Sequence, residues 1–215
     1  MRISNEIINI VPEIKKWRQQ LHAHPELGYE EEWTSNFVAE KLESFGLEIH
    51  RGLGKTGIVG VLKGLDPTLG GGGNKAIGLR ADMDALPMTE ENNFSYKSKF
   101  EGRMHACGHD GHTAMLLGAA KLLSLKNDFN GTVYFIFQPA EEGGGGGLAM
   151  IDDGLFEQFP MDSVWGMHNW PGMNEGTVAI HKGSVMAAAD KFEVTIIGNG
   201  GHCLLYTSPS PRDRG

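Results

Sequence analysis

Apolar side chains recur at two different spacings along this chain, and these spacings predict alternating helices and strands. Residues 4–21 carry apolar side chains three and four positions apart, the period of an amphipathic helix. Pro12 falls inside this segment, so we expect the regular helix to start near Pro12, because a first-turn proline is tolerated. A second helix is predicted over residues 31–44, with Gly46 as its stop. Residues 112–125 are nearly all apolar and predict a helix that is buried on most sides.

Short apolar runs bounded by glycine predict the strands, which are residues 56–62, 76–79, 131–137 and 163–167. The third run is continuously β-branched and aromatic, which suits a central parallel strand. The glycine run at residues 70–73 is expected in a hairpin or surface loop, and residues 147–154 in a further helix. Alternating strands and helices are typical of an α/β domain. We therefore predict a mixed, mostly parallel sheet with helices on both faces.

Polar side chains follow three of the predicted strands. Asp82 and Asp84 follow the second strand, Glu141 and Glu142 follow the third, and His168 ends the fourth. In α/β sheets ligands bind at the carboxyl ends of the strands, so these side chains are candidates for one site. The aspartates could ligate a metal, orient a ligand, or serve as a helix cap or turn. A metal ligand and a general base would explain two adjacent, mutually repelling glutamates, and a solvated acidic loop is the alternative.

A cluster of potential metal ligands precedes the predicted buried helix. Residues 104–113 read MHACGHDGHT, and Cys107 and His109 flank a single glycine, so both side chains can point into one cavity. A thiolate and a neutral imidazole suit late first-row metals such as zinc, cobalt or manganese. For this triplet alone, a core cysteine beside a helix-capping histidine is the alternative. Three histidines, one cysteine and one aspartate within eight residues favour the metal site.

Composition and charge exclude several classes of function. The chain has 215 residues and a formal net charge of -8, which argues against a nucleic-acid interface because phosphate contacts need a clustered positive face. Its two cysteines argue against a disulfide framework and fit a reducing compartment or a metal role for a thiol. The N-terminal residues contain no apolar leader or membrane span. A cytoplasmic protein without nucleic-acid or membrane partners is therefore expected.

Five motifs together resemble the M20 metallopeptidase family, in its amidohydrolase branch of hippurate hydrolases and N-acyl-amino-acid amidohydrolases. They are ADMDALP at 81–87, MHACGHDGHT at 104–113, QPAEEG at 138–143, MHNWP at 167–171 and GGH at 200–202. The resemblance covers about residues 5–202. It implies a zinc-exopeptidase-like catalytic domain with two divalent metal ions (Zn, Mn or Co), interrupted by a smaller α+β lid domain, in a full-length homodimer or homotetramer.

The resemblance also implies a role for each matching side chain. The implied metal ligands are Cys107, His109, Glu142 and His168. Glu141 would be the general base, Asp84 would orient the site, and His202 would help to polarise the substrate carbonyl from the neighbouring subunit. Asp82 stands where other branches of the wider family use a histidine ligand, and the cysteine would compensate for that difference.

The end of the sequence departs from the family pattern. After His202 the family continues with a small residue and a Pro-His pair, whereas this chain continues with Cys203 and a segment rich in serine, proline and arginine. We expect residues 1–186 to be the N-terminal part of the catalytic domain. Residues 187–202 are expected to start the lid, with a strand near 191–197, and 203–215 to be an artefactual tail.

The sequence thus predicts a metal-dependent hydrolase that cleaves the amide bond of small, hippurate-like N-acyl amino acids. The alternatives are a dipeptidase or aminopeptidase of the same wider family and an inactive metal-binding fragment. The family's remaining metal-binding histidine has no counterpart here. For the 215-residue chain we therefore expect weak or absent turnover, and aggregation through an unpaired sheet edge.

Overall fold

The computed structural model describes residues 3–65, 75–188, 190 and 192–198. The chain divides into two compact units, Met1–Pro171 and Gly172–Gly215, which we describe separately. All the regular secondary structure of the described residues lies in the first unit. The glycine run at 70–73, predicted in a hairpin or loop, lies outside the described residues.

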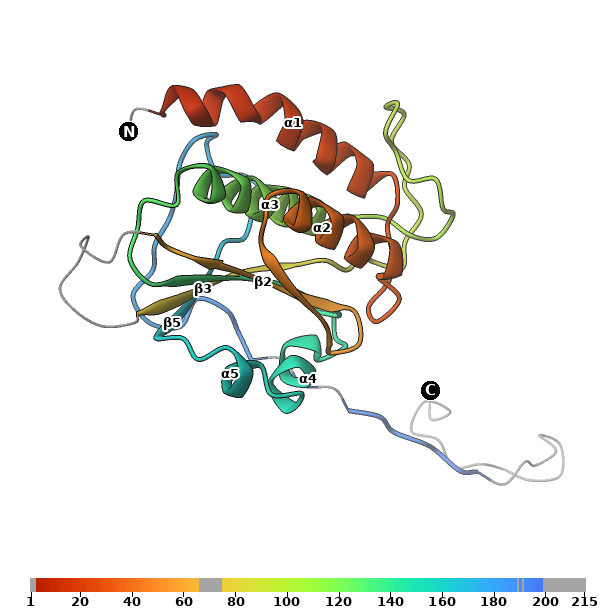
Figure 1. Cartoon of the computed structure of the whole chain (residues 1–215). Helices are drawn as coiled ribbons and strands as arrows, with labels where there is room; N and C mark the ends of the chain where they lie inside the picture. Colours follow the sequence, from red (N-terminus) through yellow and green to blue (C-terminus); the bar gives the residue numbers. More distant parts are fainter. Residues whose placement is uncertain (1–2, 66–74, 189, 191, 199–215) are drawn as a thin grey trace, which may run out of the picture. The chain divides into compact units, whose positions relative to one another are not determined.

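A five-stranded mixed sheet forms the centre of the first unit (Figure 1). Its strands are β1 (Glu48–Leu53), β2 (Gly57–Lys63), β3 (Ala76–Asp82), β4 (Thr132–Gln138) and β5 (Ser163–Gly166), in the order β1-β2-β4-β3-β5. Strand β3 pairs in parallel with both β4 and β5, whereas β2 pairs antiparallel with β1 and β4. The prediction of a mixed α/β sheet is confirmed. Two of the four pairings are parallel, and both antiparallel pairings involve β2, which alone runs against the other four strands.

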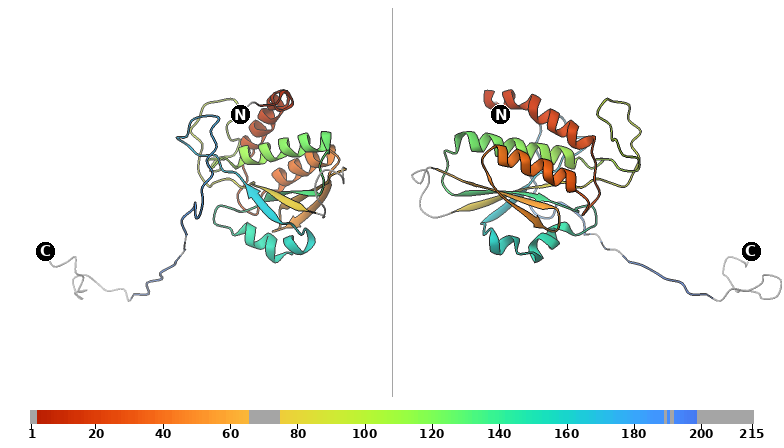
Figure 2. Two further views of the ribbon diagram at one scale, coloured as in Figure 1. Left: turned by 90° about the vertical axis from the view of Figure 1, so that its left-hand side faces the viewer. Right: turned by 45° about the vertical axis from the view of Figure 1, so that its right-hand side comes forward.

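Helices cover both faces of the sheet, as predicted. Helices α1 (Asn5–His22), α2 (Glu32–Ser44) and α3 (His109–Lys126) lie on one face, and α4 (Gly146–Asp152) and α5 (Leu155–Gln158) lie on the other (Figures 1 and 2). No helix among the described residues is long and apolar enough to cross a membrane.

Strand β2 shows how the sequence builds both layers of the core. Ile58 and Leu62 pack in the larger cluster with the apolar residues of α1, α2 and α3, whereas Val59 and Val61 pack in the smaller cluster with Met150 of α4. Successive strand residues point to opposite faces, so a run that is apolar throughout can serve two layers. The continuous apolar strand therefore requires cover on both sides, and the helices provide it.

Three local features differ from the sequence expectations. Helix α1 begins at Asn5, with the hydroxyl of Ser4 accepting from the amide of Ile7, and continues through Pro12 instead of starting there. Strand β1 was not predicted, because its sequence EIHRGL is largely polar and exposed, as edge strands often are. The four-residue helix α5 is too short to show a periodic pattern, and it was also not predicted.

The second unit has no helix or strand in the part that the structure describes. The strand expected near 191–197 is not formed over residues 192–197, where Phe192, Ile196 and Ile197 are 87%, 88% and 94% exposed. A strand requires a neighbour for its backbone hydrogen bonds, and no described segment of this unit provides one. The expected domain boundaries at residues 186 and 202 stay predictions.

A buried charged cluster ties α1 to the start of α3. His22 lies 2.6 Å from Asp110 through Nδ1 and 3.0 Å from Glu90 through Nε2, and Arg18 lies 2.8 Å from the same oxygen of Asp110. Burial by itself lowers the pKa of His22. The hydrogen bonds to Asp110 and Glu90 outweigh burial and raise the pKa above 6.5, so the charged imidazolium is the form that suits this cluster.

This cluster predicts a pH dependence of stability. Because the folded-state pKa of His22 is raised, its contribution is fully present below pH 6.5 and is lost as the pH rises through the raised value. We expect the free energy of unfolding to fall with rising pH in this range, and His22→Gln to reduce that slope. Urea unfolding at a series of pH values measures it, with His181→Gln, at an exposed position, as control. An unchanged slope in His22→Gln would contradict the prediction.

Candidate metal centre

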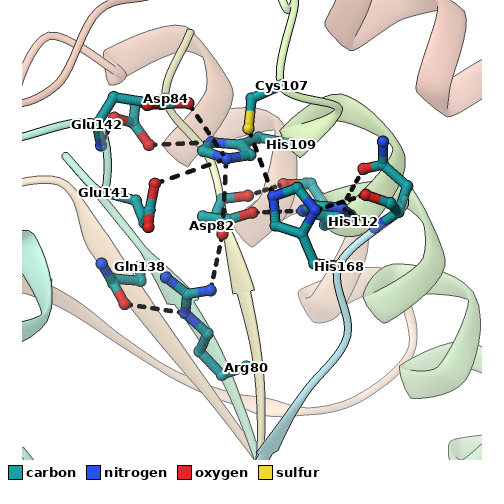
Figure 3. A network of polar contacts seen from close by, with 12 residues as sticks. Arg80, Asp82, Asp84, Cys107, His109, His112, Gln138, Glu141, Glu142 and His168 are labelled. Atoms are coloured by element: carbon teal, nitrogen blue, oxygen red, sulfur yellow. Dashed lines mark hydrogen bonds and ion pairs between the residues drawn. The ribbon is translucent and has the colours of Figure 1, made fainter. Parts of the chain in front are cut away.

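The carboxyl ends of three neighbouring strands bring the predicted side chains together (Figure 3). Asp82 is the last residue of β3, the Glu141–Glu142 pair follows β4, and His168 follows β5. Strands β4, β3 and β5 are adjacent and parallel, so their carboxyl ends share one edge of the sheet. The predicted location of the polar cluster at this edge agrees with the structure.

His109 lies at the centre of the cluster, as the first residue of α3. Its ring is fully buried, and Nδ1 lies 3.2 Å from an Asp84 oxygen, which fixes the ring. Nε2 has no hydrogen-bond partner among the described residues. It lies 3.7 Å from oxygens of Asp82 and Glu142 and 3.9 Å from an oxygen of Glu141. Buried polar atoms are normally paired, so this nitrogen is placed to bind a group that the protein itself does not supply.

Cys107 and His168 form the exposed side of the cluster. The Cys107 sulfur lies 3.4 Å from Nε2 of His168, while Nδ1 of His168 donates to the carbonyl oxygen of Asn169 at 2.6 Å. This second hydrogen bond leaves a lone pair on Nε2, the usual arrangement of a metal-ligating histidine. Burial, a hydrogen bond to Glu142 and the surrounding carboxylates raise the pKa of the Cys107 thiol to about 12. A cation bound beside the sulfur would act in the opposite direction and favour the thiolate.

The residue between Cys107 and His109 must be glycine. Gly108 has a φ of 99°, and a Cβ at this position would lie 2.2 Å from Oδ1 of Asn169. Left-handed backbone and close approach both favour glycine. The turn at Gly108 directs Cys107 and His109 to the same cluster (Figure 3).

Asp84 connects His109 with the loop that carries Glu141 and Glu142. One of its oxygens holds His109, and the other accepts from the backbone amide of Glu142 at 2.9 Å. Burial raises the pKa of Asp84, but these hydrogen bonds outweigh burial and the net pKa is lowered. An ionised Asp84 therefore holds both groups in place.

Asp82 is held from two sides by a guanidinium and an imidazole. It accepts from Arg80 and from Nδ1 of His112, each at 2.7 Å. Burial raises its pKa, but the His112 hydrogen bond and the charges of His109 and Arg80 lower the net value to about 2.

His112 and Asn169 also belong to the cluster, although the sequence predicts no role for either. His112 accepts from the backbone amide of Asn169 at 3.0 Å through Nε2, and so connects Asp82 with the turn that carries His168. The position of His112, three residues after His109 on one helix, is a signal that places both on the same helix face. Asn169 carries no comparable signal, because its contact depends on the fold. His202, the remaining predicted site residue, lies outside the described residues.

Three overlapping sets of side chains bring donor atoms within 4.8 Å of one another. They are Cys107–His109–His168, Asp82–His109–His112 and His109–Glu141–Glu142. Carboxylates, imidazoles and a thiolate together suit divalent zinc, cobalt or manganese. The unpaired Nε2 of His109 and the excess of acidic groups therefore fit a divalent metal centre.

Residues 78–209 match the protein family described as Peptidase family M20/M25/M40. The chain belongs to this family. It is 52% identical over 202 residues to the hippurate hydrolase of Campylobacter jejuni, and 48% identical over 204 residues to an N-acyl-L-amino acid amidohydrolase of Geobacillus stearothermophilus. These alignments cover 94% and 92% of this chain but 51% and 53% of the relatives, so the chain spans about half their length. The relatives place this M20 chain in the amidohydrolase branch.

A solved structure shares the fold. A Bacillus subtilis protein, described as a dinuclear metal binding peptidase from the M20 family, superimposes with a TM-score of 0.70 at 38% identity. The match covers 77% of this chain and 44% of that one. The five-stranded sheet is thus an M20-like catalytic domain fold.

Proposed function

We propose that the protein is a metal-dependent amidohydrolase that cleaves small N-acyl amino acids resembling hippurate into an amino acid and a carboxylic acid. Membership of the M20 family and the two amidohydrolase relatives support this reaction. The observation that carries the proposal is the buried, unpaired Nε2 of His109, which faces the two glutamates at the edge of the sheet.

The proposed ligands of two divalent ions are Cys107, His109, Glu142 and His168. When bound, such ions supply Lewis acidity, which lowers the pKa of water and polarises a carbonyl. Asp84 holds the ring of His109 so that Nε2 faces inward, and His168 is oriented in the same way by the carbonyl of Asn169. The metal is zinc, manganese or cobalt.

The two glutamates have different surroundings, which supports different roles. The side chain of Glu141 is 42% exposed, so its carboxylate can meet water and substrate. The side chain of Glu142 is 25% exposed, and its backbone amide is held by Asp84. We therefore assign Glu141 as the general base, which takes a proton from the attacking water and passes it to the leaving amine. Glu142 is the ligand.

Further features of the whole protein are proposed from the family. His202 would polarise the substrate carbonyl from a neighbouring subunit, which requires a homodimer or homotetramer. A cytoplasmic location suits the free thiol of Cys107, since a reducing compartment keeps it available to a metal.

The reaction can be tested in a hybrid enzyme, because the chain spans about half of the Campylobacter hippurate hydrolase. In this hybrid, the matching 202 residues of our chain replace the aligned part of that enzyme. We expect metal-dependent hydrolysis of hippurate or N-acetyl amino acids with a higher kcat/KM than that of dipeptides. Faster dipeptide cleavage would favour a dipeptidase or aminopeptidase instead. A folded hybrid that binds metal without turnover would favour an inactive metal-binding protein.

A further inference from the structure

A buried carboxylate outside the candidate metal centre contacts the loop that carries its glutamates. Glu31 directly precedes α2 and is 0% exposed, yet its side chain does not cap the helix. One of its oxygens accepts from the backbone amide of Ala140 at 2.8 Å, and the other accepts from the hydroxyl of Thr56 at 2.7 Å. Both partners lie far from Glu31 in the sequence. The carboxylate therefore connects three separate segments, one of which leads directly into Glu141.

Ala140 has a backbone conformation that needs such support. Its φ is 48°, in the left-handed region that residues other than glycine seldom adopt. Its side chain is fully buried, and a Cβ on Gly28 would lie 3.0 Å from both Cα and Cβ of Ala140. Strained backbone persists only where the surroundings hold it, and such strain gathers at functional sites. The conformation at Ala140 sets the direction in which the chain enters the glutamate pair.

The other end of the loop is held from the same N-terminal segment. Tyr29, itself at a φ of 65°, donates its hydroxyl to the carbonyl of Gly144 at 2.7 Å. The amide of Gly146 closes the loop onto the carbonyl of Ala140 at 3.1 Å. Residues 28–31 thus contact the chain before and after Glu141 and Glu142, whose carboxylates face His109 in Figure 3.

We propose that Glu31 is a positioning residue, which fixes the backbone at Ala140 so that Glu141 and Glu142 face Nε2 of His109. The inference rests on the proposed metal centre, because it assigns Glu31 an effect on ligand geometry. Burying a carboxylate in a protein core costs free energy, because its charge loses hydration. What it supplies here is an acceptor for a loop amide that would otherwise be buried and unpaired.

The alternative is that Glu31 only stabilises the fold, and three variants separate the two roles. Glu31→Ala removes both hydrogen bonds. Glu31→Gln keeps an oxygen for the amide of Ala140 and turns an N–H towards the hydroxyl of Thr56. Thr56→Val is the matched control, because it removes a buried hydrogen bond from the same carboxylate and leaves the bond to Ala140 in place.

The test measures the affinity of the 215-residue chain for Co²⁺, with the thiolate-to-cobalt charge-transfer absorption of Cys107 as the signal. Urea unfolding of each metal-free variant is measured in parallel. Loss of a group that orients ligands typically lowers metal affinity about 10- to 100-fold. We expect at least about a tenfold loss in Glu31→Ala, recovery to near wild type in Glu31→Gln, and less than about a twofold change in Thr56→Val despite its lower stability.

The outcomes distinguish the two proposals. A wild-type chain that binds no Co²⁺ would refute the metal centre and this inference together. If the wild type binds Co²⁺ and Glu31→Ala binds it equally well, only the positioning role fails. The positioning role also fails if affinity follows stability, so that Thr56→Val loses as much affinity as Glu31→Ala. If Glu31→Ala does not fold, a loss of affinity in Glu31→Gln and Thr56→Val in proportion to their loss of stability would overturn the positioning role, and near wild-type affinity at lower stability would support it.

Discussion

Replacing Glu141 with glutamine is expected to lower kcat of the hybrid enzyme at least about a hundredfold, the usual scale of general acid–base catalysis. Glutamine is nearly the same size but cannot take a proton from water. Because the side chain of Glu141 is 42% exposed at the rim of the cluster, the substitution should leave the fold intact. Steady-state kinetics and metal content measured on the same preparation give the result.

Two further variants make this prediction specific. Glu142→Gln should lose metal affinity as well as rate, since we assign Glu142 as a ligand. Glu175→Gln, at an exposed position in the second unit, should match the wild type in both measurements. Our assignment of the base would be wrong if Glu141→Gln retained normal turnover with metal bound.

The second large effect is expected from His109→Ala in the 215-residue chain. The buried ring of His109 lies between the carboxylates of Asp82 and Asp84, each 1% exposed. Removing one partner of a buried charged pair typically costs about 3–5 kcal/mol, because the remaining charge, here that of Asp84, is left uncompensated. We expect the free energy of unfolding of the metal-free chain to fall by about that amount, and Co²⁺ binding to be lost.

The control for this variant is His181→Ala, which changes an exposed histidine in the second unit. His109→Ala and His181→Ala should differ both in the free energy of unfolding by urea and in the Co²⁺ affinity from titration. Normal Co²⁺ affinity in His109→Ala would exclude His109 as a ligand.

The sequence predicts much of this site because its signals are local. The apolar runs of β3, β4 and β5 identify strands, and an acidic residue or histidine follows each one. Parallel strands bring their carboxyl ends to one edge, so position in the sequence predicts position in space. Cys107 and His109 precede a long apolar helix, a further strong pattern.

Other features depend on contacts that no local pattern reveals. Glu31 looks like one acid among several polar residues before α2, and only the fold shows that its carboxylate reaches Ala140. Asn169 meets His112 for the same reason. The failed expectations have comparable causes, since β1 is a polar edge strand, and residues 192–197 have an apolar pattern but no strand partner among the described residues of their unit.

The glycines after Glu142 leave the backbone bare beside the glutamates. Gly143, Gly144 and Gly145 are exposed and present only peptide groups beside the glutamates. Such a wall cannot discriminate among molecules by the shape of their side chains. Among the described residues, side chains border the cluster instead at a hollow that Trp170 and Pro171 line together with Cys107, His168 and their neighbours Ala106 and Asn169.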